Sequence, residues 1–111
     1  MAKKEHPFPG NWRIVWMEAW DEEYFDMEVP AHISIRRDNL GAFHFGNVQG
    51  EIDGRIETRN GQPRFAFSWA GSAELDDACG RGWAEREGNE LTGCIYFHMG
   101  EESAFKASRE Q

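Results

Sequence analysis

Cysteine is scarce in this chain of 111 residues, and the two that occur are not arranged for a common cysteine chemistry. Cys79 and Cys94 form neither a CxxC pair nor a zinc-binding spacing. This excludes a disulfide-rich scaffold and a cysteine-based zinc site. We expect two free thiols in a protein of a reducing compartment.

Long apolar runs and a net positive charge are also missing. No stretch approaches the roughly 18 apolar residues of a membrane-spanning helix, so no membrane span is expected. The first residues lack the apolar core of a secretory signal, which favours a cytoplasmic location. The net charge is −8, and an acidic protein repels the phosphates of nucleic acids, so nucleic acid is not an expected partner.

Side chains suited to a catalytic or metal centre do not cluster in the sequence. In the strand register derived below, His32, His44 and His98 point away from the core, whereas an interior haem or zinc site needs an inward histidine. No serine lies in a G-x-S-x-G context. The acidic residues 74–77 lack the spacing and the glycine of a calcium loop. An enzyme is therefore the least favoured class, and we predict no catalytic residue, no metal and no cofactor.

What the sequence does contain is a repeated hairpin pattern. Three two-residue turn signals separate stretches in which apolar and polar residues alternate: Gly46-Asn47, Asn60-Gly61 and Gly88-Asn89. Pairing the residues on either side of each turn always sets apolar positions opposite apolar positions. The pairs that this predicts include Phe45 with Val48, Phe43 with Gly50, Ile56 with Phe65, Ile52 with Trp69, and Gly82 with Ile95.

These hairpins extend to eight short strands in chain order. The predicted fold is an all-β, eight-stranded antiparallel up-and-down barrel, with a two-sheet sandwich as the alternative. A short helix is expected near residues 21–25, between the first two strands, because acidic residues fill its first turn. Residues 1–9 are predicted to be a flexible leader and 10–111 a single domain, with a longer loop over 71–80. Strands are expected at about 12–16, 33–35, 41–45, 48–56, 65–69, 81–86, 91–99 and 103–109.

The predicted interior is rich in aromatic side chains. An eight-stranded barrel is just wide enough to be filled by side chains or to hold one small ligand. Inward-facing glycine and alanine residues offset part of the ring volume, so a filled core and a ligand cavity both stay open. The rings predicted to point inward are Trp12, Trp16, Phe43, Phe45, Phe65, Phe67, Trp69, Phe97 and Phe105.

Gly10-Asn11-Trp12 at the first strand resembles the G-x-W motif that opens calycin barrels, the lipocalins and fatty-acid-binding proteins. Those families often place a late arginine across that tryptophan, and Arg109 has the inward parity for this contact. The helical insertion is similar to the lid of the fatty-acid-binding branch. The resemblance implies a noncatalytic protein that holds a small apolar ligand in its barrel, behind residues 18–28. The ligand-binding candidates are Trp12, Trp69, Phe97 and Arg109.

The whole chain also resembles a bacterial family of small proteins, through Trp20-Asp21, residues 43–46 and residues 67–71. That resemblance implies no function. Some small bacterial barrels that this chain resembles inhibit proteases through an N-terminal arm. Residues 3–9 are the corresponding candidate here.

The outer face of the last three strands is a second candidate site. The expected register sets Trp83 beside Cys94, Arg81 beside Tyr96, and Tyr96 beside Lys106. Tryptophan, tyrosine and arginine together are the composition of a binding hot spot. The acidic residues crowded over 18–28 are either a solvated connection or a docking surface for a basic partner. The alternative function is therefore a protein-interaction or inhibitor module with a filled core. Its surface for a partner or a second copy is Arg81, Trp83, Tyr96 and Lys106.

Overall fold

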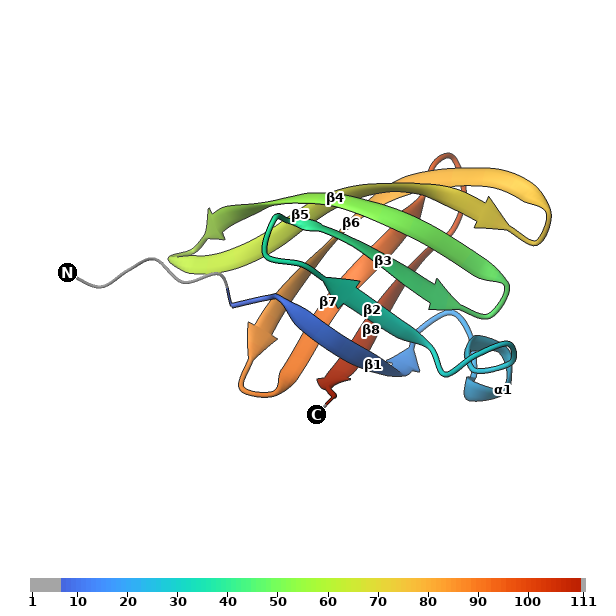
Figure 1. Ribbon diagram of the computed structural model, residues 1–111, viewed down its shortest axis with the longest axis horizontal. Coiled ribbons are helices and arrows are strands. Elements are labelled where there is room, and N and C mark those ends of the chain that lie inside the picture. The colour runs from blue at the N-terminus through green and yellow to red at the C-terminus, as the bar shows by residue number, and fades with distance from the viewer. Residues whose placement is uncertain (1–6, 111) are drawn as a thin grey trace.

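The computed structural model describes residues 7–110, in which eight antiparallel strands close into a barrel (Figure 1). Each strand pairs with the next in chain order and β8 pairs with β1, so the predicted up-and-down barrel is confirmed rather than the sandwich. Closure satisfies the backbone groups that an open sheet would expose at its edges. The strands are β1 (Gly10–Met17), β2 (His32–Ile35), β3 (Leu40–Phe45), β4 (Val48–Arg59), β5 (Gln62–Ala73), β6 (Asp76–Glu87), β7 (Glu90–Phe97) and β8 (Glu102–Arg109).

The hairpin register predicted from the three turn signals is confirmed. Gly46, Asn60, Gly61 and Gly88 all have positive φ, as the predicted tight turns require. Because the side-chain period of a strand is two, this register sends the alternating apolar residues of β4, β5 and β7 to one face. The observed pairs include Phe45 with Val48, Phe43 with Gly50, Ile56 with Phe65, Ile52 with Trp69, and Gly82 with Ile95.

The predicted loop over residues 71–80 is wrong. β5 continues to Ala73 and β6 begins at Asp76, so a turn of two residues, Glu74 and Leu75, joins the two strands. This hairpin projects at the right of Figure 1. Apolar alternation records the burial of one face of a strand, and most side chains between Gly71 and Cys79 are exposed or only half-buried. The strand there carries no alternation for sequence analysis to find.

Trp16 was predicted to point inward with Trp12 and Ile14, but it is 43% exposed. The register between β1 and β8 shifts between Ile14 and Trp16, which marks a β-bulge. The extra residue leaves both Val15 and Trp16 outside and returns Met17 to the core. A bulge reverses the facing of every later residue in the strand, and the sequence has no clear signal for it.

β7 pairs with β8 as predicted, but the predicted register between them is wrong. β7 ends at Phe97, and the Phe97 amide donates to the carbonyl of Glu101 at 2.8 Å, which closes a turn over residues 98–101. Met99, predicted inward, is 93% exposed in this turn. Tyr96 consequently pairs with Glu102, and Lys106 lies opposite Thr92 instead of beside Tyr96. The ammonium of Lys106 lies 5.5 Å from the ring of Trp16.

The interior is packed with aromatic rings in direct contact. The ring of Trp69 lies 5.0 Å from that of Phe43 and 5.2 Å from that of Phe97, both edge to face. At Gly50, a Cβ would come within 2.8 Å of both Phe43 and Trp69. The inward glycine therefore makes room for rings, which is the arrangement that a filled core needs.

The predicted helical insertion is present as α1 (Glu22–Phe25), between β1 and β2. Asp21 caps the helix by accepting a hydrogen bond from the Tyr24 amide. The Tyr24 hydroxyl donates to Asn47 Oδ1 at 2.6 Å, and the Gly46 amide donates to the Phe25 carbonyl at 2.8 Å. These contacts fasten the insertion to the β3–β4 turn.

Residues 7–9, expected within a flexible leader, pack against the barrel instead. Phe8 is fully buried, and its ring lies 5.7 Å from that of Phe65. Its carbonyl accepts a hydrogen bond from Trp12 Nε1 at 2.9 Å, and Arg86 donates to the Pro7 carbonyl at 2.6 Å. The remainder of the predicted leader and protease-inhibiting arm, residues 1–6, lies outside the described residues.

Candidate binding site

The barrel has two ends with different chemistry. At the terminal end, β1 begins and β8 finishes beside the β4–β5 and β6–β7 turns. The insertion end carries α1 and the β3–β4, β5–β6 and β7–β8 turns (Figure 1). The candidate site residues divide between these two ends.

Trp12 and Arg109 meet at the terminal end. They are paired across β1 and β8, and the Arg109 guanidinium lies 5.3 Å from the centre of the buried indole. A second cation, Arg86, lies 5.4 Å from the same ring. With Phe8 accepting the hydrogen bond from the indole nitrogen, this arrangement plugs the end of the barrel and satisfies the polar atom of the tryptophan.

Trp69 and Phe97 meet at the insertion end. Trp69 Nε1 donates to the Tyr96 carbonyl at 3.2 Å, which orients the indole against β7. Trp20 covers this cluster from the insertion, 5.3 Å from Phe45 and 6.1 Å from Phe97. The four residues proposed to line one cavity therefore form two separate pairs at opposite ends of an aromatic interior.

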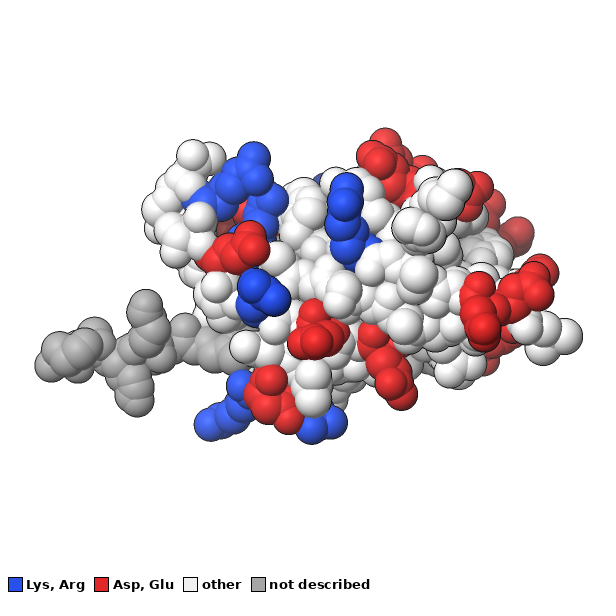
Figure 2. Space-filling view, turned by 90° about the horizontal axis from the view of Figure 1, so that it is seen from above, with Lys and Arg blue, Asp and Glu red and all other residues white. Residues whose placement is uncertain are grey.

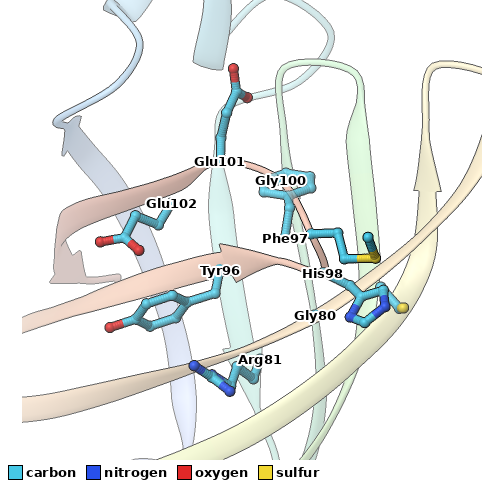
Figure 3. Close-up of a pocket in the computed structure, with 10 residues that line it drawn as sticks. Gly80, Arg81, Tyr96, Phe97, His98, Gly100, Glu101 and Glu102 are labelled. Atoms are coloured by element: carbon cyan, nitrogen blue, oxygen red, sulfur yellow. The ribbon is translucent and has the colours of Figure 1, made fainter.

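A pocket of about 420 Å³ lies on the outside of the barrel at the insertion end. Figure 3 shows Tyr96 between Arg81 and Glu102 in this pocket. The three residues are cross-strand neighbours on β6, β7 and β8, and the guanidinium of Arg81 lies 5.1 Å from the centre of the Tyr96 ring. The pocket residues are Cys79, Gly80, Arg81, Tyr96, Phe97, His98, Met99, Gly100, Glu101 and Glu102.

The pocket forms because β6 extends beyond the end of β7. The last backbone link between them is the His98 amide donating to the Cys79 carbonyl at 2.8 Å. Past that point β6 continues toward its own turn while the chain from β7 folds back through residues 98–101. Gly80 permits this close approach of the two strands, since a Cβ there would overlap the Tyr96 carbonyl oxygen.

Two of the four surface residues predicted from sequence lie in this pocket, and two do not. Arg81 and Tyr96 line it, whereas Trp83 lies two residues farther along β6, half-buried opposite Cys94. The guanidinium of Arg64 stacks 3.9 Å from the Trp83 ring and forms an ion pair of 2.8 Å with Glu85. Lys106 is separated from this group and lies with Trp16. The predicted four-residue patch is thus split.

Sequence analysis missed the two most exposed apolar side chains of the described residues. Leu75 is 98% exposed in the β5–β6 turn, and Met99 is 93% exposed in the β7–β8 turn. Met99 has φ 57°, a left-handed conformation that disfavours a side chain of its kind. The sequence pattern predicts a loop at Leu75 and an inward strand position for Met99, so it identifies neither as an exposed surface residue.

Negative charge surrounds these apolar tips. Figure 2 shows acidic side chains gathered toward the right of the molecule, the insertion end, and basic ones toward the other end. The exposed acids of the two turns and their flanks, apart from those of residues 18–28, are Glu74, Asp76, Asp77, Glu101 and Glu102. Such a surface attracts a positively charged partner.

The two cysteines should differ strongly in reactivity. Cys79 is exposed in the pocket, whereas Cys94, opposite Trp83, is buried, and burial raises the pKa of the Cys94 thiol. The thiolate is the reactive form. Near pH 8 we expect iodoacetamide to label Cys79 at least about tenfold faster than Cys94, as measured by mass spectrometry of peptides. Both should react at similar rates in urea, and equal rates in the folded protein would contradict the burial of Cys94.

The described part of the chain meets the requirements of neither a metal site nor a membrane-spanning helix. Within residues 7–110, no group of three or more histidine, cysteine, aspartate or glutamate side chains is placed to hold a metal ion. The single described helix is too short and too polar to cross a membrane. Comparisons with protein-family models, curated proteins and solved structures found no match.

Proposed function

We propose that this protein is a noncatalytic interaction module that binds a protein partner through the outer surface of its insertion end. The observation that supports this best is the exposure of Met99 beside the pocket, within an acidic surface. A large apolar side chain held in solvent costs hydration free energy, and its burial by a partner removes that cost. The neighbouring side chains of Arg81 and Tyr96 belong to residue types that are enriched at protein interfaces.

The chemistry of the surface indicates what the partner presents. Glu101 and Glu102 favour lysine or arginine, while Met99 and the half-buried Phe97 favour an apolar side chain between those cations. A basic amphipathic segment combines both features. The cytoplasmic location expected from the sequence remains part of this proposal.

A calycin-like barrel that holds a small apolar ligand is the second candidate. The contact of Arg109 with Trp12 supports it, because calycin barrels often close one end in this way. A ligand in the interior would have to displace rings that now contact each other, including those of Trp69, Phe43 and Phe97. The filled interior therefore favours the surface over the lumen.

Native mass spectrometry of the protein as purified distinguishes the two candidates. A bare chain mass supports action through the surface. A native excess of a few hundred daltons that disappears on denaturation supports an interior ligand and contradicts the filled-core proposal.

Changing the turn that carries Met99 should weaken binding of a basic amphipathic probe. We expect a lysine- and leucine-rich peptide to perturb the backbone NMR signals of Arg81, Tyr96 and His98. The double variant Met99→Asn and Glu101→Lys should bind this peptide about tenfold more weakly by calorimetry, because it loses the apolar tip and reverses one charge. Asparagine tolerates the left-handed φ of the turn.

Glu51→Lys is the matched control for the charge change. Glu51 is exposed in the middle of β4, where it pairs with Ala42 and Ala70, away from the pocket. The affinity of the Glu51→Lys variant for the peptide should stay within about twofold of that of the parent protein, because a remote surface charge contributes little to binding. Equal losses in both variants, or NMR changes spread over all acidic residues, would indicate only general attraction of the peptide to the acidic protein.

A further inference from the structure

β4 has an unpaired edge at the terminal end of the barrel. Its pairing with β3 ends where Asp53 meets Leu40, yet β4 continues to Arg59. The Gly54 amide still donates to the Asn39 carbonyl at 2.9 Å, and beyond it no described strand covers this side of β4. Figure 1 shows β4 running past the turn between β2 and β3. Unpaired backbone groups in a regular strand are a template for another strand.

The direction of the free backbone groups follows from Gly54. Because its N–H points toward the β3 side, the strand period of two also directs the N–H and C=O groups of Ile56 and Thr58 to that side. In an antiparallel pair, two residues of this kind that lie opposite each other exchange both of their hydrogen bonds. Ile56 is thus a suitable centre for such a pair.

The charges around Ile56 are antisymmetric along the strand. Arg55 directly precedes it and Glu57 directly follows it. When a strand pairs with its own copy in antiparallel register, each residue faces the one at equal distance on the other side of the centre. This pattern therefore sets Arg55 of one chain opposite Glu57 of the other, and such opposite-charge pairs stabilise cross-strand contacts.

We propose that the β4 edge binds the same edge of a second copy of this chain, in antiparallel register centred on Ile56. The two Ile56 residues then form the central hydrogen-bonded pair, and Arg55 of each chain faces Glu57 of the second copy. The pairing stops before Asp53, whose place on this side of β4 is already taken by Leu40 of β3. The contact uses one surface patch twice, as a two-fold symmetric dimer does.

The side chains at this edge are available for such a contact. Ile56 is 39% exposed, and its two charged neighbours are exposed as well. Among residues 7–110, Arg55 and Glu57 form no ion pair. Arg64, which lies opposite Glu57 on β5, is paired with Glu85 instead. Charges on an edge strand normally discourage pairing by repulsion. Here their antisymmetric order makes them complementary in one register.

The dimer leaves the insertion ends free, because the β4 edge lies at the terminal end. Two copies joined in this way would carry two identical partner-binding surfaces, which raises the avidity for a partner with repeated segments. The contact does not depend on the proposed function, since none of the residues of the pocket takes part in it.

Charge reversal tests the register directly. The expected contact covers few residues, so we expect a weak dimer that sedimentation velocity detects between about 10 µM and about 1 mM. In Arg55→Glu two glutamates face each other, and in Glu57→Arg two arginines do. Each variant alone should dimerise at least about tenfold more weakly than the parent chain.

An equimolar mixture of the two variants supplies the decisive result. The Arg55→Glu variant has glutamate at both positions 55 and 57, and the Glu57→Arg variant has arginine at both. A heterodimer of the two variants therefore restores both opposite-charge pairs and should form with near-parental affinity. Glu51→Arg, on the fully paired part of β4, is the control that should dimerise normally. A parent chain that stays monomeric throughout this range would overturn the proposal, and so would a mixture that fails to restore dimers. Circular dichroism confirms that each exposed variant is folded.

Discussion

Replacing Trp12 by alanine should lower the free energy of unfolding by about 3–5 kcal/mol, the cost typical of removing a buried tryptophan. Trp12 is fully buried at the terminal end, with the guanidinium groups of Arg86 and Arg109 within 5.4 Å of its ring centre. Its loss would leave a cavity and would also remove the donor to the Phe8 carbonyl, which holds the N-terminal segment in place. Urea denaturation followed by circular dichroism measures the change.

Trp16→Ala is the matched control, because it removes the same side chain from the same strand. Trp16 lies outside the barrel beyond the bulge, where Lys106 is its cationic neighbour. Its replacement should cost less than about 1 kcal/mol. Similar losses for the two tryptophans would contradict the register of β1, since it is the bulge that separates their environments.

Replacing Gly80 by alanine should destabilise the protein by about 3 kcal/mol, although it adds only one methyl group. The new Cβ would overlap the Tyr96 carbonyl oxygen and would lie 2.9 Å from Trp69 Nε1. β6 and β7 would have to separate, which weakens the hydrogen bond from that nitrogen to the Tyr96 carbonyl. Thermal and urea unfolding measure the loss.

Gly100→Ala is the control for the chemistry of this substitution. Gly100 lies in the adjacent turn, and the nearest atom to an added Cβ is Phe97 Cβ at 3.2 Å, with no backbone atom closer than 3.8 Å. An exposed turn accommodates such a contact by a small shift, so the cost should stay below about 1 kcal/mol. Equal effects at both positions would contradict the close approach of β6 and β7 at Gly80.

These two predictions connect the fold to the proposed surface. Trp12 holds the terminal end closed, whereas Gly80 lets β6 and β7 approach where the pocket opens between their ends. The Gly80→Ala variant, in its folded form, should bind the basic probe peptide more weakly than the parent protein. A change at Trp12 should affect stability while leaving the pocket of the remaining folded molecules unchanged, because the two sites lie at opposite ends of the barrel.

Local turn chemistry and alternation in the sequence were sufficient to predict the hairpins. Asn60-Gly61 and Gly88-Asn89 supply residues that adopt positive φ readily, and each pairing that follows is determined once the turn is known. The contact of Arg109 with Trp12 was expected from the resemblance to calycin barrels, together with the inward parity of Arg109. The order of the strands followed from the succession of hairpins, whereas the pairing of β8 with β1 decided for the closed barrel over the sandwich.

The incorrect predictions of strand ends and side-chain facing have a common physical origin. Alternation reports which face of a strand is buried, so it disappears where the β5–β6 ribbon leaves the barrel, near Leu75. It is also reversed without warning by an extra residue, as at Trp16, and by an unrecognised turn, as at Met99.

The sequence by itself determined that this chain forms eight antiparallel strands in hairpin order around an aromatic interior, because those properties depend on neighbours in the chain and on residue type. Only the tertiary structure decided which side chains meet at the surface. It divided Trp12 and Trp69 between opposite ends, separated Lys106 from Tyr96, and left the end of β4 without a neighbour. Such placements depend on where strands of unequal length begin and end relative to one another, and local pairing rules do not specify that geometry.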